Sequence, residues 1–130
     1  MSVSLLSHID RSYVMIGALF AFLSVALGAF GAHALRTRVS SEKFAVYQTG
    51  VQYQMYHALA LVVLAIVIPY VSNQEIAVWA GSFFIIGIVL FSGSLYWLTF
   101  GGKRALGAIT PFGGLAFLIG WLLLFISAFG

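Results

Sequence analysis

The chain has 130 residues, of which 62% are hydrophobic and only 7% are charged, and its mean hydropathy is +1.09. This composition leaves too little polar surface for a water-soluble domain and predicts an integral membrane protein. The net charge of +3 comes from cations that flank the apolar runs, a pattern that does not indicate nucleic-acid binding. The chain contains no cysteine, which excludes disulfides, thiolate nucleophiles and cysteine-based metal sites.

The first apolar run, from Tyr13 to Leu35, is predicted to be a transmembrane helix. It exceeds the roughly 7 to 15 apolar residues at the centre of a signal peptide. Small residues that recur at helical spacing form a stripe along it: Gly17, Ala21, Ser24, Gly28 and Ala32. Such a stripe lets a neighbouring backbone approach closely, so we expect a helix–helix contact on this face.

A short amphipathic helix is expected at the membrane interface over residues 41–49. Ser40 can cap its N-terminus, and Glu42 is favourable beside the positive end of the helix dipole. Gly50 either separates this helix from the second span or lies within one continuous helix, and the sequence leaves both arrangements open.

Three further spans are predicted at residues 51–71, 74–100 and 110–129. Ser72 and Glu75 have the spacing of a capping box, so the second and third spans are expected to form a tight hairpin. Thr110 and Pro111 supply an N-cap and a first-turn proline for the last span. That span carries a second stripe of small residues: Gly113, Ala116, Gly120 and Ser127.

Four spans with short connections predict a single-domain, all-α membrane protein folded as an up-and-down antiparallel bundle. Cations concentrate after the first and third spans: Arg36, Arg38, Lys43, Lys103 and Arg104. The positive-inside rule then predicts cytoplasmic loops at these two places and both termini on the periplasmic or extracellular side. These cations serve either as topogenic signals only or also as contacts for an anionic lipid head group.

Polar side chains gather in the predicted cytoplasmic half of the bundle. On the second span they form two adjacent ladders at i, i+4 spacing: Gln48, Gln52, Tyr56 and Thr49, Tyr53, His57. The candidates for lining a polar cavity or ligand site are His33, Gln48, Gln52, Tyr53, Tyr56, His57, Ser92, Ser94, Tyr96 and Thr110. These residues line a cavity or form a hydrogen-bonded polar core.

His57 has two interpretations. An ionisable group inside a membrane is costly and usually faces an interior, which is typical of a proton relay or ligand contact. The alternative is a neutral histidine bonded to Tyr53, Tyr96, Ser92 or another helix. His33 and His57 could together ligate a haem, although the predicted spans put them roughly 6 Å apart in depth. No closed metal site is indicated.

The signatures of enzymes are weak in this sequence. No acidic residue lies deep inside a span to orient a histidine, and Ser92 and Ser94 lack an elbow motif. The segment 101–104 lacks the glycine spacing of a phosphate-binding loop. We therefore expect a protein that is not an enzyme.

Four blocks of sequence are distinctive: GAFGAHAL at 28–35, TGVQYQMYHALA at 49–60, FSGSLY at 91–96 and GAITPFGG at 107–114. Together they resemble the YgdD and transmembrane-protein-256 family of small multi-pass membrane proteins. The resemblance covers essentially the whole chain and implies a protein of the bacterial inner (plasma) membrane. It implies neither an established activity nor a set of catalytic residues.

The sequence supports two functional hypotheses. The first is a structural or accessory component of the membrane, which packs through its glycine stripes with copies of itself or with a larger complex. The second is a small transporter, channel or ligand- or lipid-binding subunit that uses a polar cytoplasmic-side cavity around His57.

Overall fold

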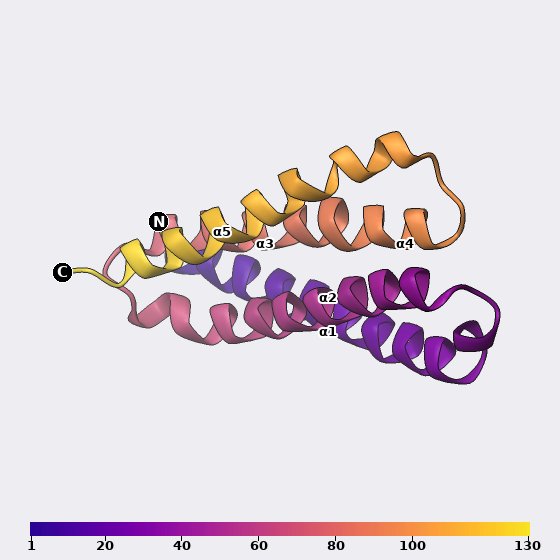
Figure 1. The fold of residues 1–130 in the computed structure, drawn as a ribbon. Helices are drawn as coiled ribbons and strands as arrows, with labels where there is room; N and C mark the ends of the chain where they lie inside the picture. The colour runs from indigo at the N-terminus through magenta and orange to yellow at the C-terminus, as the bar shows by residue number, and fades with distance from the viewer.

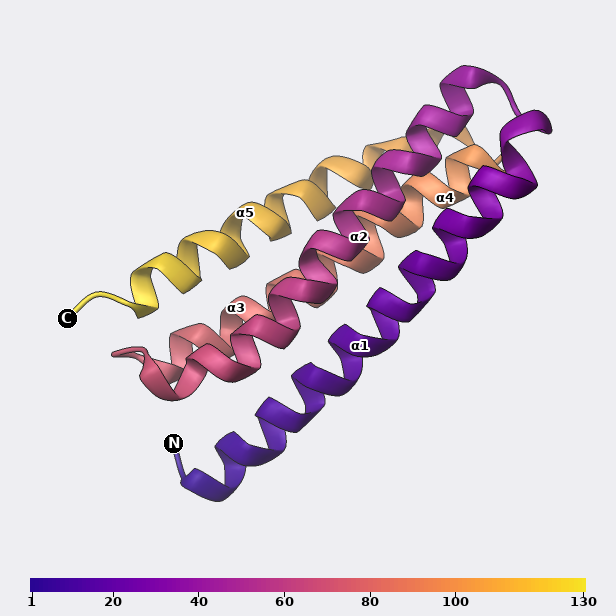
Figure 2. The same cartoon turned by 90° about the horizontal axis from the view of Figure 1, so that it is seen from below.

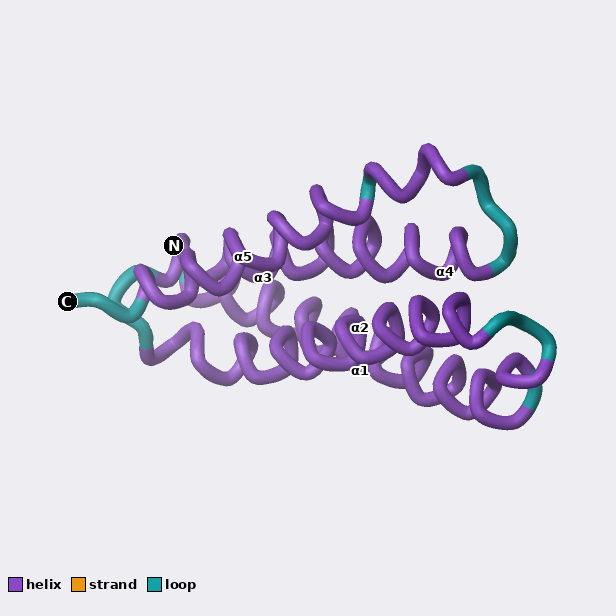
Figure 3. Tube along the Cα trace, viewed as in Figure 1, coloured by secondary structure: helices purple, strands orange, loops and turns teal.

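The computed structural model describes all 130 residues and consists of helices joined by short loops (Figures 1 and 3). Four segments are long and apolar enough to cross a membrane. They confirm the predicted all-α, up-and-down arrangement. The α-helices are α1 (Val3–His33), α2 (Ser41–Val67), α3 (Gln74–Gly87), α4 (Gly93–Thr99) and α5 (Thr110–Ser127).

The helix starts depend on local capping. Ser2 caps α1, since its Oγ accepts a hydrogen bond from Leu5 N–H at 3.3 Å, and α1 therefore begins well before the predicted Tyr13. Asn73, rather than the predicted Ser72, caps α3 through a 3.2 Å bond from Ile76 N–H. Residue-type preferences alone do not distinguish these two neighbouring polar side chains.

The helix expected over 41–49 is not a separate element, because it forms the first turns of α2. Ser40 caps it as predicted, accepting from Lys43 N–H at 3.2 Å. Gly50 lies inside the continuous helix against the ring of Tyr96, where a Cβ would lie 2.8 Å from Tyr96 Cε1. This glycine therefore allows close packing and does not break the helix, since a helical glycine costs only about 1 kcal/mol relative to alanine.

The third span contains a π-helical turn that the sequence did not predict. This turn, η3 (Ile88–Ser92), joins α3 to α4 without a break, and the Gly93 N–H donates to Ile88 O. A π turn inserts an extra residue and changes the direction of the side chains that follow it. Ser92 consequently faces α2, where it donates to Gly50 O at 2.7 Å, whereas Ser94 faces α5.

The helices form two hairpins that pack against each other. Within the hairpins, α1 packs along α2, and α5 packs along α3; α2 then contacts α3 and α4 between the hairpins. Figure 2 shows α1 and α5 on opposite sides of the central pair. The most apolar stretches of the two central spans are 44% and 39% buried, against 17% for α1 and 22% for the last span. The outer helices therefore present most of their surface to the surroundings.

Both termini lie at the same end of the bundle as the connection between α2 and α3 (Figure 1). We call this the terminal end and the opposite end the loop end. The loop end holds the turn η1 (Leu35–Thr37) and the turn η4 (Arg104–Ala108) that precedes α5. The main hydrophobic core brings together residues of α1, α2, η2 (Ile68–Tyr70), α3, η3 and α5: Tyr13, Leu61, Leu64, Ala65, Ile68, Ala77, Phe84, Ile88 and Phe117.

The small-residue stripes pack inside the chain. Gly17 of α1 lies so close to α2 that a Cβ would be 2.7 Å from Ala58 O. In α5, Gly113 packs on the Phe91 backbone and Gly120 packs on Phe84. The predicted helix–helix contact of these stripes is therefore made within the chain at the buried positions, which α2, α3 and η3 occupy. Ala32 of the first stripe remains exposed.

Candidate functional site

The polar candidates do not line a single cavity. Tyr96 belongs to a bonded network around Gln54, Ser92 bonds separately to Gly50 O, Ser94 and Thr110 form a pair, and Tyr53 and His57 line a groove. The remaining candidates are exposed on α1 or α2: His33, Gln48, Gln52 and Tyr56. Of these, Gln48 and Gln52 border a small pocket of about 130 Å³ between α1 and α2.

The bonded network joins α1, α2 and α4 near the loop end. Its centre is Gln54, which is 3% exposed. The Gln54 Nε2 donates to Phe20 O at 2.9 Å, and its Oε1 accepts from the Tyr96 hydroxyl at 2.6 Å. The Tyr47 hydroxyl donates to Leu27 O in the same region. Because a buried amide must be hydrogen-bonded, these contacts fix the three helices relative to one another.

Sequence reasoning did not include Gln54 among the candidates. The sequence did contain a signal for Gln54, because a glutamine within a span needs hydrogen-bond partners wherever it is buried. The two ladders of side chains on α2 drew the prediction to Gln48 and Gln52 instead, and both of these are exposed.

The pair formed by Ser94 and Thr110 links α4 to the start of α5. The hydroxyl oxygens of Ser94 and Thr110 lie 2.5 Å apart, and Ser94 also donates to Phe91 O at 2.9 Å. Thr110 was predicted to cap α5, but the cap position is Ile109 and no side chain bonds there. The Thr110 hydroxyl contacts Ser94 in place of the helix end.

His57 is buried between α2 and α5, with 4% of its surface exposed. Its Nδ1 lies 2.7 Å from Tyr53 O, and its Nε2 lies 3.0 Å from Trp121 Nε1. A carbonyl only accepts and an indole N–H only donates, so these partners fit the neutral tautomer with the proton on Nδ1. The geometry matches the interpretation of a neutral, bonded histidine, with the partner helix being α5.

Aromatic rings hold the imidazole in place. The Phe117 ring stacks on it with centroids 3.6 Å apart and planes 9° apart, and Phe84 lies at 5.4 Å. Tyr53 packs on Phe91 with centroids 4.8 Å apart. The result is a rigid aromatic wall that runs from α2 across η3 to α5.

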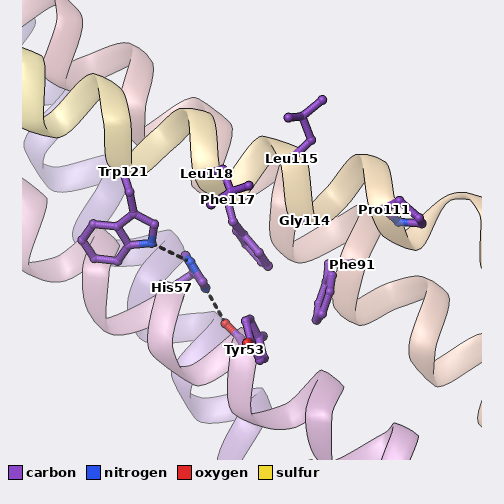
Figure 4. Close-up of a pocket in the computed structure, with 9 residues that line it drawn as sticks. All are labelled: Tyr53, His57, Phe91, Pro111, Gly114, Leu115, Phe117, Leu118 and Trp121. Atoms are coloured by element: carbon purple, nitrogen blue, oxygen red, sulfur yellow. Dashed lines mark hydrogen bonds between the residues drawn. The ribbon is translucent and has the colours of Figure 1, made fainter.

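This wall backs a groove of about 570 Å³ between α2 and α5, which Figure 4 shows. The size lies within the range of about 300–1,000 Å³ typical of ligand sites. Its lining is mainly apolar and aromatic, rather than the polar lining predicted: Tyr53, His57, Phe91, Pro111, Gly114, Leu115, Phe117, Leu118 and Trp121. The groove lies on the side of the bundle, so it is accessible from the surroundings of the helices.

The haem hypothesis requires His33 and His57 to meet at one iron. His33 is the last residue of α1 and is exposed, whereas His57 faces α5, and α1 and α5 lie on opposite sides of the central helices. Trp121 also occupies the Nε2 that would bind iron. The structure therefore does not bring the two imidazoles together. It contains no group of three or more metal-ligating side chains.

Residues 27–114 match the family model described as "Protein of unknown function (DUF423)". The chain belongs to the DUF423 family. It is 47% identical over 118 residues to the UPF0382 membrane protein YwdK of Bacillus subtilis, covering 91% of this chain and 96% of the relative. It is 45% identical over 119 residues to the UPF0382 membrane protein SH2409 of Staphylococcus haemolyticus, covering 92% and 96%. No solved structure matches the chain.

This DUF423 chain is a membrane protein, in agreement with the names of its bacterial relatives and with its four apolar spans. The region that matches the DUF423 model begins near the end of α1 and ends in the first turns of α5. It includes Gln54 and His57, while Trp121 lies beyond it.

Five of the six lysines and arginines of the DUF423 chain cluster at the loop end, and these five are exposed: Arg36, Arg38, Lys43, Lys103 and Arg104. Lys103 and Arg104 precede α5, whose Pro111 lines the groove. The groove thus begins close to a positively charged loop, an arrangement that complements an apolar chain with an anionic head.

Proposed function

We propose that this DUF423 protein is a non-enzymatic accessory component of the bacterial cytoplasmic membrane that binds one lipid along the groove between α2 and α5. The observation that carries the proposal is the groove itself, which is apolar, aromatic and located on the side of a membrane-spanning bundle. An acyl or isoprenoid chain has the chemistry that such a lining accepts.

The hydrogen bonds of the buried polar groups favour a lipid-binding protein over a transporter. His57, Gln54 and Ser92 each bond to partners within the chain, mostly backbone carbonyls. Residues that relay protons or line an aqueous path need bonds that can be exchanged with water or substrate. Here those bonds hold the helices together, so the transporter or channel hypothesis is the weaker of the two.

The positive loop end favours an anionic head group. We infer that the loops bearing these cations lie in the cytoplasm and that both termini lie outside, since cytoplasmic loops carry the excess of Lys and Arg. The head group would then contact Lys103 and Arg104, with its chain against Leu115 and Phe117. We also infer that the YgdD and transmembrane-protein-256 proteins are part of the same wider family, because their characteristic blocks recur in this chain.

A variant that fills the groove tests the proposal. Gly114 lines the groove, and a Cβ there would meet only the Phe91 ring, at 3.8 Å, so Gly114→Leu can begin a side chain at this wall in ordinary van der Waals contact. We expect this variant to retain about one tenth of the wild-type bound phosphatidylglycerol, measured by native mass spectrometry after mild-detergent purification. The reason is that the added side chain occupies the volume of the lipid chain.

Gly93→Leu is the matched control, because Gly93 is exposed and no atom lies within 4 Å of its Cβ position. This variant should bind lipid as the wild type does. Equal lipid occupancy in the wild type and in Gly114→Leu would contradict the proposal.

A further inference from the structure

The outward face of α2 carries polar side chains that have no partner in the chain. Gln52 and Tyr56 are exposed, one helical turn apart, and neither side chain makes a hydrogen bond within the structure. Tyr56 is 55% exposed. Neither residue lines the groove, although the Tyr56 ring packs edge-on against Tyr53, which does.

The depth of these residues follows from the contact of α2 with η3. Trp79 and Trp97 are exposed and lie about 27 Å apart along the third span, close to the thickness of a hydrocarbon core. Tryptophan prefers the membrane interface, so these two residues mark the boundaries. The bond from Ser92 to Gly50 O places Gly50 about 7.5 Å inside the Trp97 boundary.

Gln52 then lies about 10 Å inside that boundary, and Tyr56 lies about 16 Å inside it. Both side chains lean toward the start of the helix, but a glutamine is too short to reach the interface from that depth. An amide facing lipid has no hydrogen-bond partner, and such groups are costly in hydrocarbon. Something other than lipid chains should therefore cover this face.

A second copy of the chain supplies what Gln52 lacks. Two copies with the same membrane orientation meet around a two-fold axis along the membrane normal, so identical residues face each other at the same depth. A glutamine amide carries both a donor and an acceptor, so a pair of them is self-complementary. A charged or purely apolar residue at this position could not form such a self-complementary pair of hydrogen bonds.

The spacing of the exposed residues fits a helix–helix seam. The residues after Gln52 on this face recur at alternating steps of four and three, the pattern of a and d positions in a parallel coiled coil, and all are exposed: Tyr56, Leu59, Val63, Ile66 and Tyr70. Figure 2 shows α2 in front of α3 and α4, with α1 and α5 on either side of it. We propose that the protein forms a parallel dimer through α2, with Gln52 paired to Gln52 of a second copy.

Cysteine cross-linking in native membranes tests this dimer, because the chain contains no cysteine and each variant reports one position. Leu59→Cys places a thiol on the proposed seam, and Leu122→Cys places one on α5, where the side chain is similarly exposed, at 57% against 52%. Under copper–phenanthroline oxidation, Leu59→Cys should give at least about five times the disulfide-linked dimer of Leu122→Cys, since paired Cα atoms must approach within about 7 Å.

Adding Gln52→Leu to Leu59→Cys should lower the dimer yield to the level of the α5 control, and Gln52→Asn should restore part of it. Gln52 bonds to nothing within the chain, so these changes leave the fold of one copy intact, which its thermal unfolding in detergent checks. Equal yields from the two helices, or a Leu59→Cys yield that Gln52→Leu does not change, would overturn the proposal.

Discussion

At the scale of single residues, His57 shows how a membrane protein can keep an imidazole without using it for chemistry. Both ring nitrogens have partners of fixed character, a carbonyl and an indole N–H. The ring also packs face to face on Phe117. These contacts link α2 to α5 across the back of the groove and fix the shape of its wall.

This link predicts a coupled effect on stability. Trp121→Phe leaves Nε2 of His57 without its donor, and His57→Phe leaves the Trp121 N–H without its acceptor. We expect each single variant to lower the free energy of unfolding by about 1 kcal/mol. The double variant should cost about 1 kcal/mol less than the sum, because it removes both partners at once.

Unfolding in mixed SDS micelles measures the three free energies, and Leu118→Ala serves as a neighbouring change on α5 that makes no hydrogen bond. Strictly additive costs for His57→Phe and Trp121→Phe would show that the bond does not contribute.

At the scale of helices, the packing of α1 against α2 depends on how closely each small residue of α1 approaches α2. Two glycines on α1 differ sharply in this distance. A Cβ at Gly17 would lie 2.7 Å from Ala58 O, whereas a Cβ at Gly28 would meet only Val51 Cγ1 at 3.7 Å. The first distance requires the helices to separate, and the second is ordinary contact. Small residues in one sequence stripe are thus not equivalent.

Alanine substitutions at these two positions form a matched pair. Gly28→Ala should be neutral or stabilise the protein by up to about 1 kcal/mol, since alanine favours the helix. Gly17→Ala should destabilise it by about 1–3 kcal/mol, because overpacking outweighs that preference. Thermal unfolding of the two variants in the same detergent compares them, and similar midpoints would contradict the packing argument.

The sequence predicted the helices better than it predicted the site. The lengths of the apolar runs alone were enough to locate the four spans. In lipid, the backbone polar groups must be hydrogen-bonded within the protein, and a helix is one of the few structures that achieves this. The π turn at Ile88–Ser92 was not predictable, since it depends on how Ser92 and Phe91 fit against neighbouring helices. His57 is buried and Gln52 is exposed because of how α2 is rotated about its own axis. The periodicity of the sequence predicts which broad face of a helix is buried, but it does not predict this rotation closely enough to separate the two residues.

At the scale of the whole molecule, orientation in the membrane decides which leaflet contains the positive loop end. Five of the six lysines and arginines lie at one end of the bundle, and both termini lie at the other. The proposed lipid site and the exposed polar residues of α2 are both nearer the loop end. A reversed orientation would place both in the opposite leaflet.

Cysteine labelling measures this orientation. A membrane-impermeant maleimide should label Ser2→Cys in intact cells and should label Lys103→Cys at least about ten times more strongly once the membrane is permeabilised, as the distribution of cations predicts. Both positions are exposed, so access by the reagent depends on sidedness alone. Labelling of Lys103→Cys in intact cells would reverse the assignment.

The pairing of α1 with α2 and of α3 with α5 has a consequence for biosynthesis. Each of these two large contacts joins spans that follow one another along the chain. During synthesis, each hairpin can therefore close as soon as its second span leaves the ribosome and enters the bilayer. The folding step that then remains within one chain is the docking of two preformed hairpins, which the bonds of Gln54 and Ser92 to the opposite hairpin would hold in register.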